Sequence, residues 1–192
     1  MDPFTLFLFA VAGYIVSKNQ TVAGVIKGVS TVTKSISKAA SFINAQYKNA
    51  QIIEDETGIS PVITLLQAAH ESNFGTSYLA TQYHNLFGIK PSQAWIKASK
   101  PLAYFDNVAS EGGASANFRA YSSDLESMRD WAEFLRTLYP LSYSAAQKGD
   151  TDLFFDGLQK GKYGAYATDP NYKKSALALL PAVTGSLPTG TA

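Results

Sequence analysis

The chain has 192 residues, 46% of them hydrophobic, which suffices for one domain of ordinary size with a packed core. It contains no cysteine, and this excludes disulfides and thiolate metal sites. The formal net charge of +1 argues against nucleic acid as the main partner, because duplex-binding proteins present a basic face.

The first 50 residues differ from the rest in charge. They hold five lysines and one aspartate, a net charge of +4, whereas residues 51–192 hold 11 basic and 14 acidic residues, a net charge of −3. Residues 4–16 form an uncharged run of 13 residues, shorter than the ~20 that a membrane-spanning helix needs. We interpret this run as a membrane-associating segment, with a cleaved signal or a helix packed on a partner as alternatives. Residues 19–45 are expected to be a helical or flexible tether.

A helix is predicted from residue 61 to near Gly75. Ser60 and Pro61 fit the N-cap and first helical position, and the apolar residues that follow recur at helical spacing: Val62, Leu65, Leu66 and Ala69.

Glu71 falls in the last turn of this helix. The carbonyl end of a helix disfavours a carboxylate anion, and Phe74 and Leu79 nearby would remove water from it. Both effects favour the protonated form of a carboxyl group, which a general acid needs. Glu71 is therefore a candidate proton donor, although an isolated glutamate at a helix end is more often a solvated surface residue.

The remaining elements follow in order. Residues 96–118 lack helical periodicity and contain turn residues at Asp106-Asn107 and Glu111-Gly112-Gly113, which favours a small β-hairpin lobe. Ser123 and Glu126 form a capping box before a helix that ends near Pro140. Asp150 or Thr151 begins a short helix ending at Gly161, and Asp169 begins the last one. The predicted fold is mainly α with a small β-hairpin lobe.

Four segments in one order resemble the endo-β-N-acetylglucosaminidases of glycoside hydrolase family 73, a group that includes flagellar rod-cap proteins, autolysins and phage lysins. They are Ala68–Gly75, His84–Lys90, Phe118–Ser123 and Tyr166–Tyr172. The family usually has Leu or Met in place of His70 and Trp in place of Phe74. The resemblance covers roughly residues 50–182 and implies a lysozyme-like α+β fold. Together with the composition of the N-terminal residues it predicts three parts: an apolar segment and tether (1–45), a catalytic domain (46–182) and a flexible tail (183–192).

The resemblance also implies site residues. Glu71 would be the general acid, with Tyr166 beside it. Glycoside hydrolysis normally uses a second carboxyl group, for which Asp106 and Glu111 are candidates, unless the 2-acetamido group of the substrate assists instead.

Substrate contacts are expected from Asn85, Phe87, Trp95 and Tyr163, since aromatic side chains suit the apolar faces of sugars. Asn85 would fix its loop or the acetamido group. Helical spacing favours core packing for Trp131, and packing is also the favoured role of Tyr172. The two histidines match no zinc signature, so neither a metal nor another cofactor is expected.

The predicted function is hydrolysis of the β-1,4 bond between N-acetylglucosamine and N-acetylmuramic acid in peptidoglycan, on the reducing side of N-acetylglucosamine. A lytic transglycosylase or muramidase of the same fold, and a non-enzymatic wall-binding assembly protein, are the alternatives. The expected partners are glycan strands and, through residues 4–16, a membrane, for a monomer in the cell envelope. The sequence does not decide among phage, flagellar and autolysin roles, although the apolar start favours a virion-associated or membrane-anchored enzyme.

Overall fold

A computed structural model describes residues 22–105 and 116–188 of the chain. The chain divides into two compact units, Met1–Lys38 and Ala39–Ala192, and the second contains the hydrophobic core. In chain order the elements are α2 (Val22–Thr57), α3 (Pro61–Ser72), α4 (Tyr78–Tyr83), α5 (Gln93–Lys97), β1 (Leu102–Phe105), β2 (Ala116–Arg119), α6 (Asp124–Leu138), α7 (Pro140–Gln147), α8 (Thr151–Leu158), α9 (Tyr172–Leu177) and α10 (Leu180–Thr184). The predicted class, mainly α with a small β-hairpin lobe, is confirmed.

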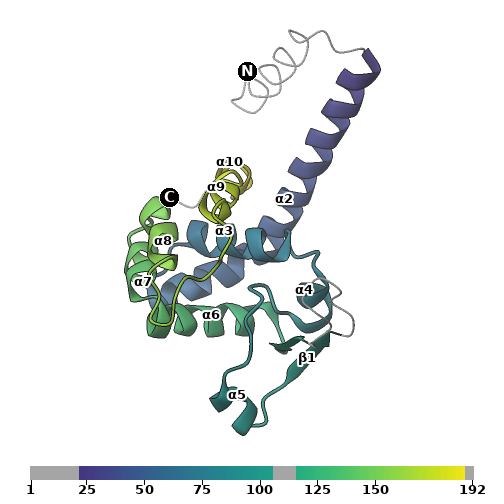
Figure 1. Ribbon diagram of the computed structural model, residues 1–192. Helices are drawn as coiled ribbons and strands as arrows, with labels where there is room; N and C mark the ends of the chain where they lie inside the picture. Colours follow the sequence, from purple (N-terminus) through teal and green to yellow (C-terminus); the bar gives the residue numbers. More distant parts are fainter. Residues whose placement is uncertain (1–21, 106–115, 189–192) are drawn as a thin grey trace. The chain divides into compact units, whose positions relative to one another are not determined.

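Helix α6 runs through the second unit, with α7 and α8 at one end and the hairpin and α5 at the other (Figure 1). Its Trp131 is fully buried, stacked on Phe87 with ring centroids 4.7 Å apart and edge-on to Phe154 at 6.3 Å. The predicted core role of Trp131 is therefore confirmed. Truncating such a residue to alanine costs about 3–5 kcal/mol of stability. Other fully buried large side chains of this core are Ile43, Ile53, Ile59, Ile63, Leu65, Leu66, Leu86, Met128 and Phe155.

Side-chain caps explain the starts of several helices. The Ser123 hydroxyl accepts a hydrogen bond from the Glu126 amide at 3.2 Å, and the Asp150 carboxylate accepts one from the Leu153 amide at 2.9 Å, as predicted. Ser60 precedes α3, but its side chain makes no cap bond, so the start of α3 depends on Pro61 at the first position. Pro140 ends α6 and also begins α7, a helix that the sequence analysis did not predict.

The hairpin is the predicted small lobe. Its strands are antiparallel, with Leu102 opposite Arg119 and Phe105 opposite Ala116. Arg119 joins the lobe to α6 because its Nη1 lies 2.6 Å from Asp130 Oδ2. The Tyr121 hydroxyl donates to the same oxygen at 2.7 Å, and burial raises the pKa of Tyr121, so it stays a donor at neutral pH.

Core packing extends beyond both expected edges of the catalytic domain. Phe42 and Ile43, which precede the expected boundary at residue 46, are buried in the core and lie within α2. At the other end the predicted last helix is two helices, α9 and α10; Val183 of α10 is buried, and Leu187 packs against the core. The boundaries at 46 and 182 stay predictions, but a truncated chain must retain Phe42 and Ile43.

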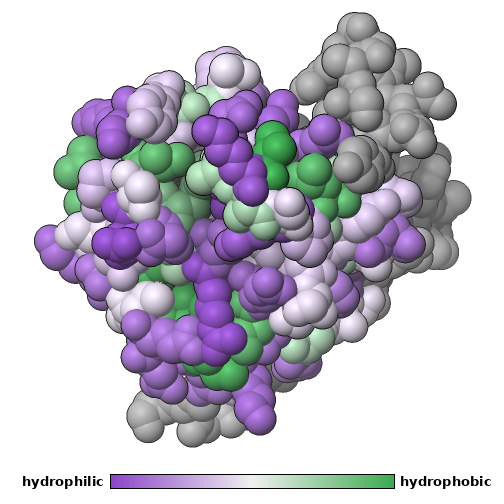
Figure 2. All heavy atoms as spheres, turned by 90° about the horizontal axis from the view of Figure 1, so that it is seen from below, coloured by the Kyte–Doolittle hydropathy of each residue, from purple (hydrophilic) through white to green (hydrophobic). Residues whose placement is uncertain are grey.

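On the face of the molecule seen in Figure 2, hydrophobic residues lie in separate areas among polar ones. The exposed large hydrophobic side chains of the described residues come from four different helices and from the segment between α8 and α9; they are Tyr78, Ile96, Leu141, Leu153 and Tyr163. Within residues 22–105 and 116–188, no helix has the length and apolar character needed to span a bilayer. The apolar run at residues 4–16 lies outside the described residues.

Candidate active site

Glu71 lies in the last turn of α3, as predicted. The helix ends because Asn73 adopts a left-handed conformation (φ 51°) and its amide donates to Ala69 O. Gly75 follows with φ 71°, and a Cβ atom there would come within 2.9 Å of the Phe42 ring. The glycine therefore allows the chain to leave the helix close against α2, which holds the end of α3 in place.

One oxygen of the Glu71 side chain is held by two donors. The Tyr172 hydroxyl of α9 donates a short hydrogen bond to Oε1, and Gln67 Nε2, one turn earlier in α3, lies 3.2 Å from the same atom. Gln67 Nε2 also donates to the Tyr172 hydroxyl at 2.6 Å. No described residue donates to Oε2 of Glu71, whose side chain is 19% exposed. The arrangement fixes Oε1 as an acceptor and leaves Oε2 available to carry a proton.

Two tyrosines enclose this carboxyl group. Burial raises the pKa of Tyr172 and of Tyr166, and the nearby Glu71 charge adds to the rise in both. Both hydroxyls therefore stay protonated at neutral pH. The Tyr166 hydroxyl donates to Phe87 O at 3.1 Å, and its ring lies 5.9 Å from that of Tyr172. Tyr166 thus lies in the cluster around Glu71, but Tyr172 makes the direct hydrogen bond.

A cavity of about 240 Å³ opens beside Glu71. Tyr78, which is 51% exposed, lines it together with Leu79 and Phe118, so apolar surface lies next to the carboxyl group. Such a mixture of apolar walls and few polar groups is typical of ligand sites. The complete lining is Glu71, Ser77, Tyr78, Leu79, Asn85, Gly88 and Phe118.

Asn85 lines this cavity, but its side-chain amide forms its hydrogen bonds with backbone groups. Its Nδ2 donates to Arg119 O at 2.8 Å and Ile89 O at 3.3 Å, and its Oδ1 accepts from the amides of Phe87 and Ile89. These four bonds use the full capacity of the amide group. Of the two roles considered for Asn85, fixing its loop is the one that the structure shows.

Three other predicted binding residues do not line the cavity. Phe87 belongs to the core beneath Trp131. Trp95 is only 7% exposed, donates its indole N–H to Pro101 O at 3.0 Å, and is covered by the Arg119 guanidinium 4.6 Å above its ring. Tyr163 is 81% exposed in the segment between α8 and α9. A role in substrate binding for these three residues stays a prediction.

Asp106 and Glu111, the two candidates for the second carboxyl group, lie outside the described residues. The strands that flank them end at Phe105 and begin at Ala116. Phe118 of β2 lines the cavity beside Glu71, so the hairpin belongs to the same part of the molecule as the candidate acid. Within residues 22–105 and 116–188, no group of three or more acidic or histidine side chains could hold a metal ion.

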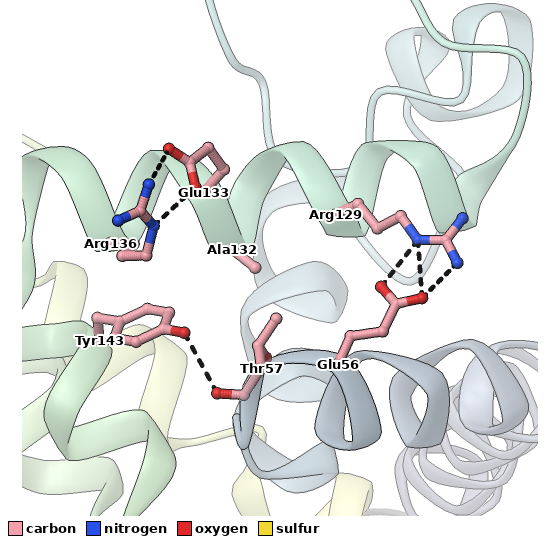
Figure 3. A pocket seen from close by; sticks show the side chains of 7 residues that line it. All are labelled: Glu56, Thr57, Arg129, Ala132, Glu133, Arg136 and Tyr143. Carbon is pink, nitrogen blue, oxygen red and sulfur yellow. Dashed lines mark hydrogen bonds and ion pairs between the residues drawn. The ribbon is translucent and has the colours of Figure 1, made fainter.

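A second cavity, of about 370 Å³, lies between the end of α2 and α6 (Figure 3). Its charged groups are paired with one another: Arg129 with Glu56 through several hydrogen bonds, and Arg136 with Glu133 at 2.7 Å. The Arg129 guanidinium lowers the pKa of the Glu56 carboxyl. Glu71 is not part of this cavity, which offers no comparable proton donor.

Two side chains that hydrogen-bond to Glu71 were not predicted from the sequence. Gln67 precedes Glu71 by four residues, a spacing that places both on one helix face, so it could have been found. Tyr172 was expected only to pack. It is indeed 6% exposed in the core, but its hydroxyl reaches Glu71 from 101 residues away, and no local pattern encodes such a contact.

Comparisons with known proteins identify the family of this chain. The glucosaminidase family model, described as mannosyl-glycoprotein endo-β-N-acetylglucosaminidase, matches residues 47–183. The peptidoglycan hydrolase FlgJ of Vibrio parahaemolyticus is 27% identical over 168 residues, which cover 84% of this chain and 53% of FlgJ. The exo-glucosaminidase LytG of Bacillus subtilis is 29% identical over 163 residues, 79% of this chain and 54% of LytG. The chain thus spans about half the length of these relatives.

Among solved structures, the crystal structure of a peptidoglycan hydrolase from Sphingomonas sp. A1 matches with a TM-score of 0.62 and 24% identity. The match covers 80% of this chain and 98% of that one, and it shows a shared fold. The family match spans most of the chain, including Glu71 and every residue that lines the cavity beside it. The chain therefore belongs to the glucosaminidases of glycoside hydrolase family 73.

Proposed function

We propose that this protein hydrolyses the β-1,4 bond between N-acetylglucosamine and N-acetylmuramic acid in peptidoglycan, on the reducing side of N-acetylglucosamine, with Glu71 as the general acid. The observation that carries the proposal is the fixed orientation of the Glu71 carboxyl group at the cavity. Tyr172 and Gln67 both donate to Oε1, which leaves Oε2 as the atom that gives up a proton. The relatives named peptidoglycan hydrolase support the substrate.

The chemical step follows from this geometry. Oε2 of Glu71 donates its proton to the glycosidic oxygen while the bond from that oxygen to the anomeric carbon breaks, and the departing sugar leaves as a neutral alcohol. Glu71 becomes an anion in the same step. The hydrogen bonds from Tyr172 and Gln67 to Oε1 then act on a full charge, so they are stronger in the transition state than in the ground state.

A water molecule must then add to the anomeric carbon and lose a proton. Asp106 or Glu111 would accept that proton. In the alternative, the 2-acetamido oxygen of the substrate bonds to the anomeric carbon as the leaving sugar departs, and the Glu71 anion accepts the proton of the water that later opens this intermediate. Both carboxyl groups belong to the segment that joins β1 to β2, and this hairpin carries Phe118 into the cavity.

The walls of the cavity suit a sugar. The Tyr78 ring, Leu79 and Phe118 offer apolar surface to the faces of a pyranose ring. Tyr78 is a half-exposed residue that combines an apolar ring with a polar hydroxyl, as carbohydrate-binding aromatic residues often do. We infer that one N-acetylated sugar unit lies against these residues, and that the enzyme works where peptidoglycan is found, in the cell envelope.

Reducing-end analysis of digested peptidoglycan tests the proposal. The wild type should generate new reducing ends on N-acetylglucosamine, and Glu71→Gln should generate almost none. New reducing ends on N-acetylmuramic acid would indicate a muramidase, and anhydro ends would indicate a lytic transglycosylase. If the wild type releases no new ends from peptidoglycan, the enzymatic proposal fails and a wall-binding role becomes the better account.

A further inference from the structure

His70 lies beside Glu71 in the last turn of α3 and contacts α9. Its Nε2 is 3.0 Å from the Ser175 hydroxyl oxygen. Its ring meets the Tyr172 ring edge-on, with centroids 5.0 Å apart and planes at 85°. The histidine therefore contacts both the residue that donates to Glu71 and a second residue one turn further along α9.

The direction of the hydrogen bonds identifies the tautomer of His70. The Ser175 hydroxyl donates to Tyr172 O at 2.9 Å. A hydroxyl has one hydrogen, so Ser175 can only accept from His70, and Nε2 must carry the hydrogen. Nδ1 is buried without a hydrogen-bond partner among the described residues. It is 3.7 Å from Glu71 Oε1, too far for a hydrogen bond.

These contacts connect His70 to the candidate acid through two residues of α9. His70 donates to Ser175, Ser175 donates to the backbone oxygen of Tyr172, and the Tyr172 hydroxyl donates to Glu71, the residue adjacent to His70. We propose that His70 is a positioning residue: through Ser175 it fixes Tyr172 so that the tyrosine hydroxyl remains on Oε1 of Glu71. The proposal rests on the function proposed above, in which Glu71 is the proton donor.

The simpler alternative is that His70 only fills space between α3 and α9. The two accounts predict opposite rankings of two substitutions. Glutamine can place its amide nitrogen near the position of Nε2 and keep the hydrogen bond to Ser175, whereas leucine fills similar space without a donor. If His70 only packs, His70→Leu should be at least as active as His70→Gln.

Steady-state kinetics on soluble peptidoglycan fragments distinguishes the two accounts. His70→Leu and Ser175→Ala should each lower kcat about fivefold, the effect of one hydrogen bond, with KM unchanged. His70→Gln should stay within about twofold of the wild type. The double variant His70→Leu/Ser175→Ala should be no worse than either single variant, because both break the same link. Melting temperatures verify that every variant is folded, and Ser175→Ala remains informative if His70→Leu is not.

A second measurement does not depend on activity. The chain has only two histidines, so nitrogen NMR of the imidazoles shows two sets of signals, and the His70→Gln variant assigns them. At neutral pH His70 should be the Nε2–H tautomer, and this preference should weaken in Ser175→Ala. An Nδ1–H tautomer in the wild type, a His70→Leu enzyme with wild-type kcat, or additive losses in the double variant would each overturn the proposal. A wild type that cleaves no peptidoglycan would instead refute the proposed function, and the tautomer would still test the hydrogen bond from His70 to Ser175.

Discussion

Replacing Tyr172 by phenylalanine isolates the hydrogen bond that fixes Glu71. The ring remains and keeps its edge contacts with His70 at 5.0 Å and Phe155 at 6.0 Å. What is lost is the donor to Glu71 Oε1 and the acceptor for Gln67 Nε2. Gln67 retains its own 3.2 Å bond to Glu71, so we expect the free energy of unfolding to fall by only about 1–2 kcal/mol.

The effect on catalysis should be larger than the effect on stability. A hydrogen bond to a charged group is worth about 1.5–3 kcal/mol, and this one gains its full strength only when Glu71 has given up its proton. Since 1.36 kcal/mol corresponds to a factor of ten, kcat of Tyr172→Phe should fall by about 10- to 100-fold while KM changes little.

The assay is the rate of reducing-end release from soluble peptidoglycan fragments, measured alongside thermal unfolding. Tyr143→Phe is a matched control, because it also removes a tyrosine hydroxyl that donates a hydrogen bond, to Thr57 O at 3.2 Å, at the cavity of Figure 3. It should lose about 1 kcal/mol of stability and no activity. An unchanged kcat in Tyr172→Phe, or a loss that lies entirely in KM, would refute the reasoning.

Three further predictions concern the N-terminal residues, the hairpin and the buried tyrosines. A protein of residues 39–192 should fold and retain its activity on purified peptidoglycan, because the core lies in that unit; an insoluble or inactive product would show that the first 38 residues are needed. Of Asp106→Asn and Glu111→Gln, one should lose far more turnover than the other, and full activity in both and in the double variant would favour assistance by the substrate. The pKa of Tyr166 and Tyr172 is raised in the folded protein, so the unfolded chain loses these protons at a lower pH than the folded chain does. The contribution of these tyrosines to the free energy of unfolding should therefore be constant up to about pH 10 and decrease above it. Denaturant titrations at increasing pH measure this decrease.

The position of Glu71 could be predicted because its causes are local. Pro61 begins α3, and the predicted end near Gly75 is three residues beyond the observed last residue, Ser72, so the sequence alone places the carboxyl group in the last turn. The same holds for the caps at Ser123 and Asp150, whose side chains bond amides three residues away. The small hairpin lobe was also predictable, from the loss of helical periodicity between two helical stretches.

The environment of Glu71 could not be predicted in the same way, since it depends on contacts between distant segments. Tyr172 reaches Glu71 only because α9 packs on α3, and the sequence indicates packing for such a residue without indicating its hydroxyl contact. The surroundings of Trp95 also depend on distant segments. A substrate contact was expected from its aromatic ring, but Arg119 from β2 and Lys100 both lie 4.6 Å from that ring, and the residue is buried. Its role in substrate binding stays a prediction.

The central claim is that Glu71 donates the proton that breaks the glycosidic bond, and Glu71→Gln tests it most directly. Glutamine preserves the size of the side chain and an oxygen that can accept from Tyr172, but it has no proton to transfer at neutral pH. The rate of reducing-end release from peptidoglycan should fall by at least ~100-fold, while the melting temperature stays near that of the wild type. A folded Glu71→Gln enzyme that retains activity within a few-fold of the wild type would contradict the account.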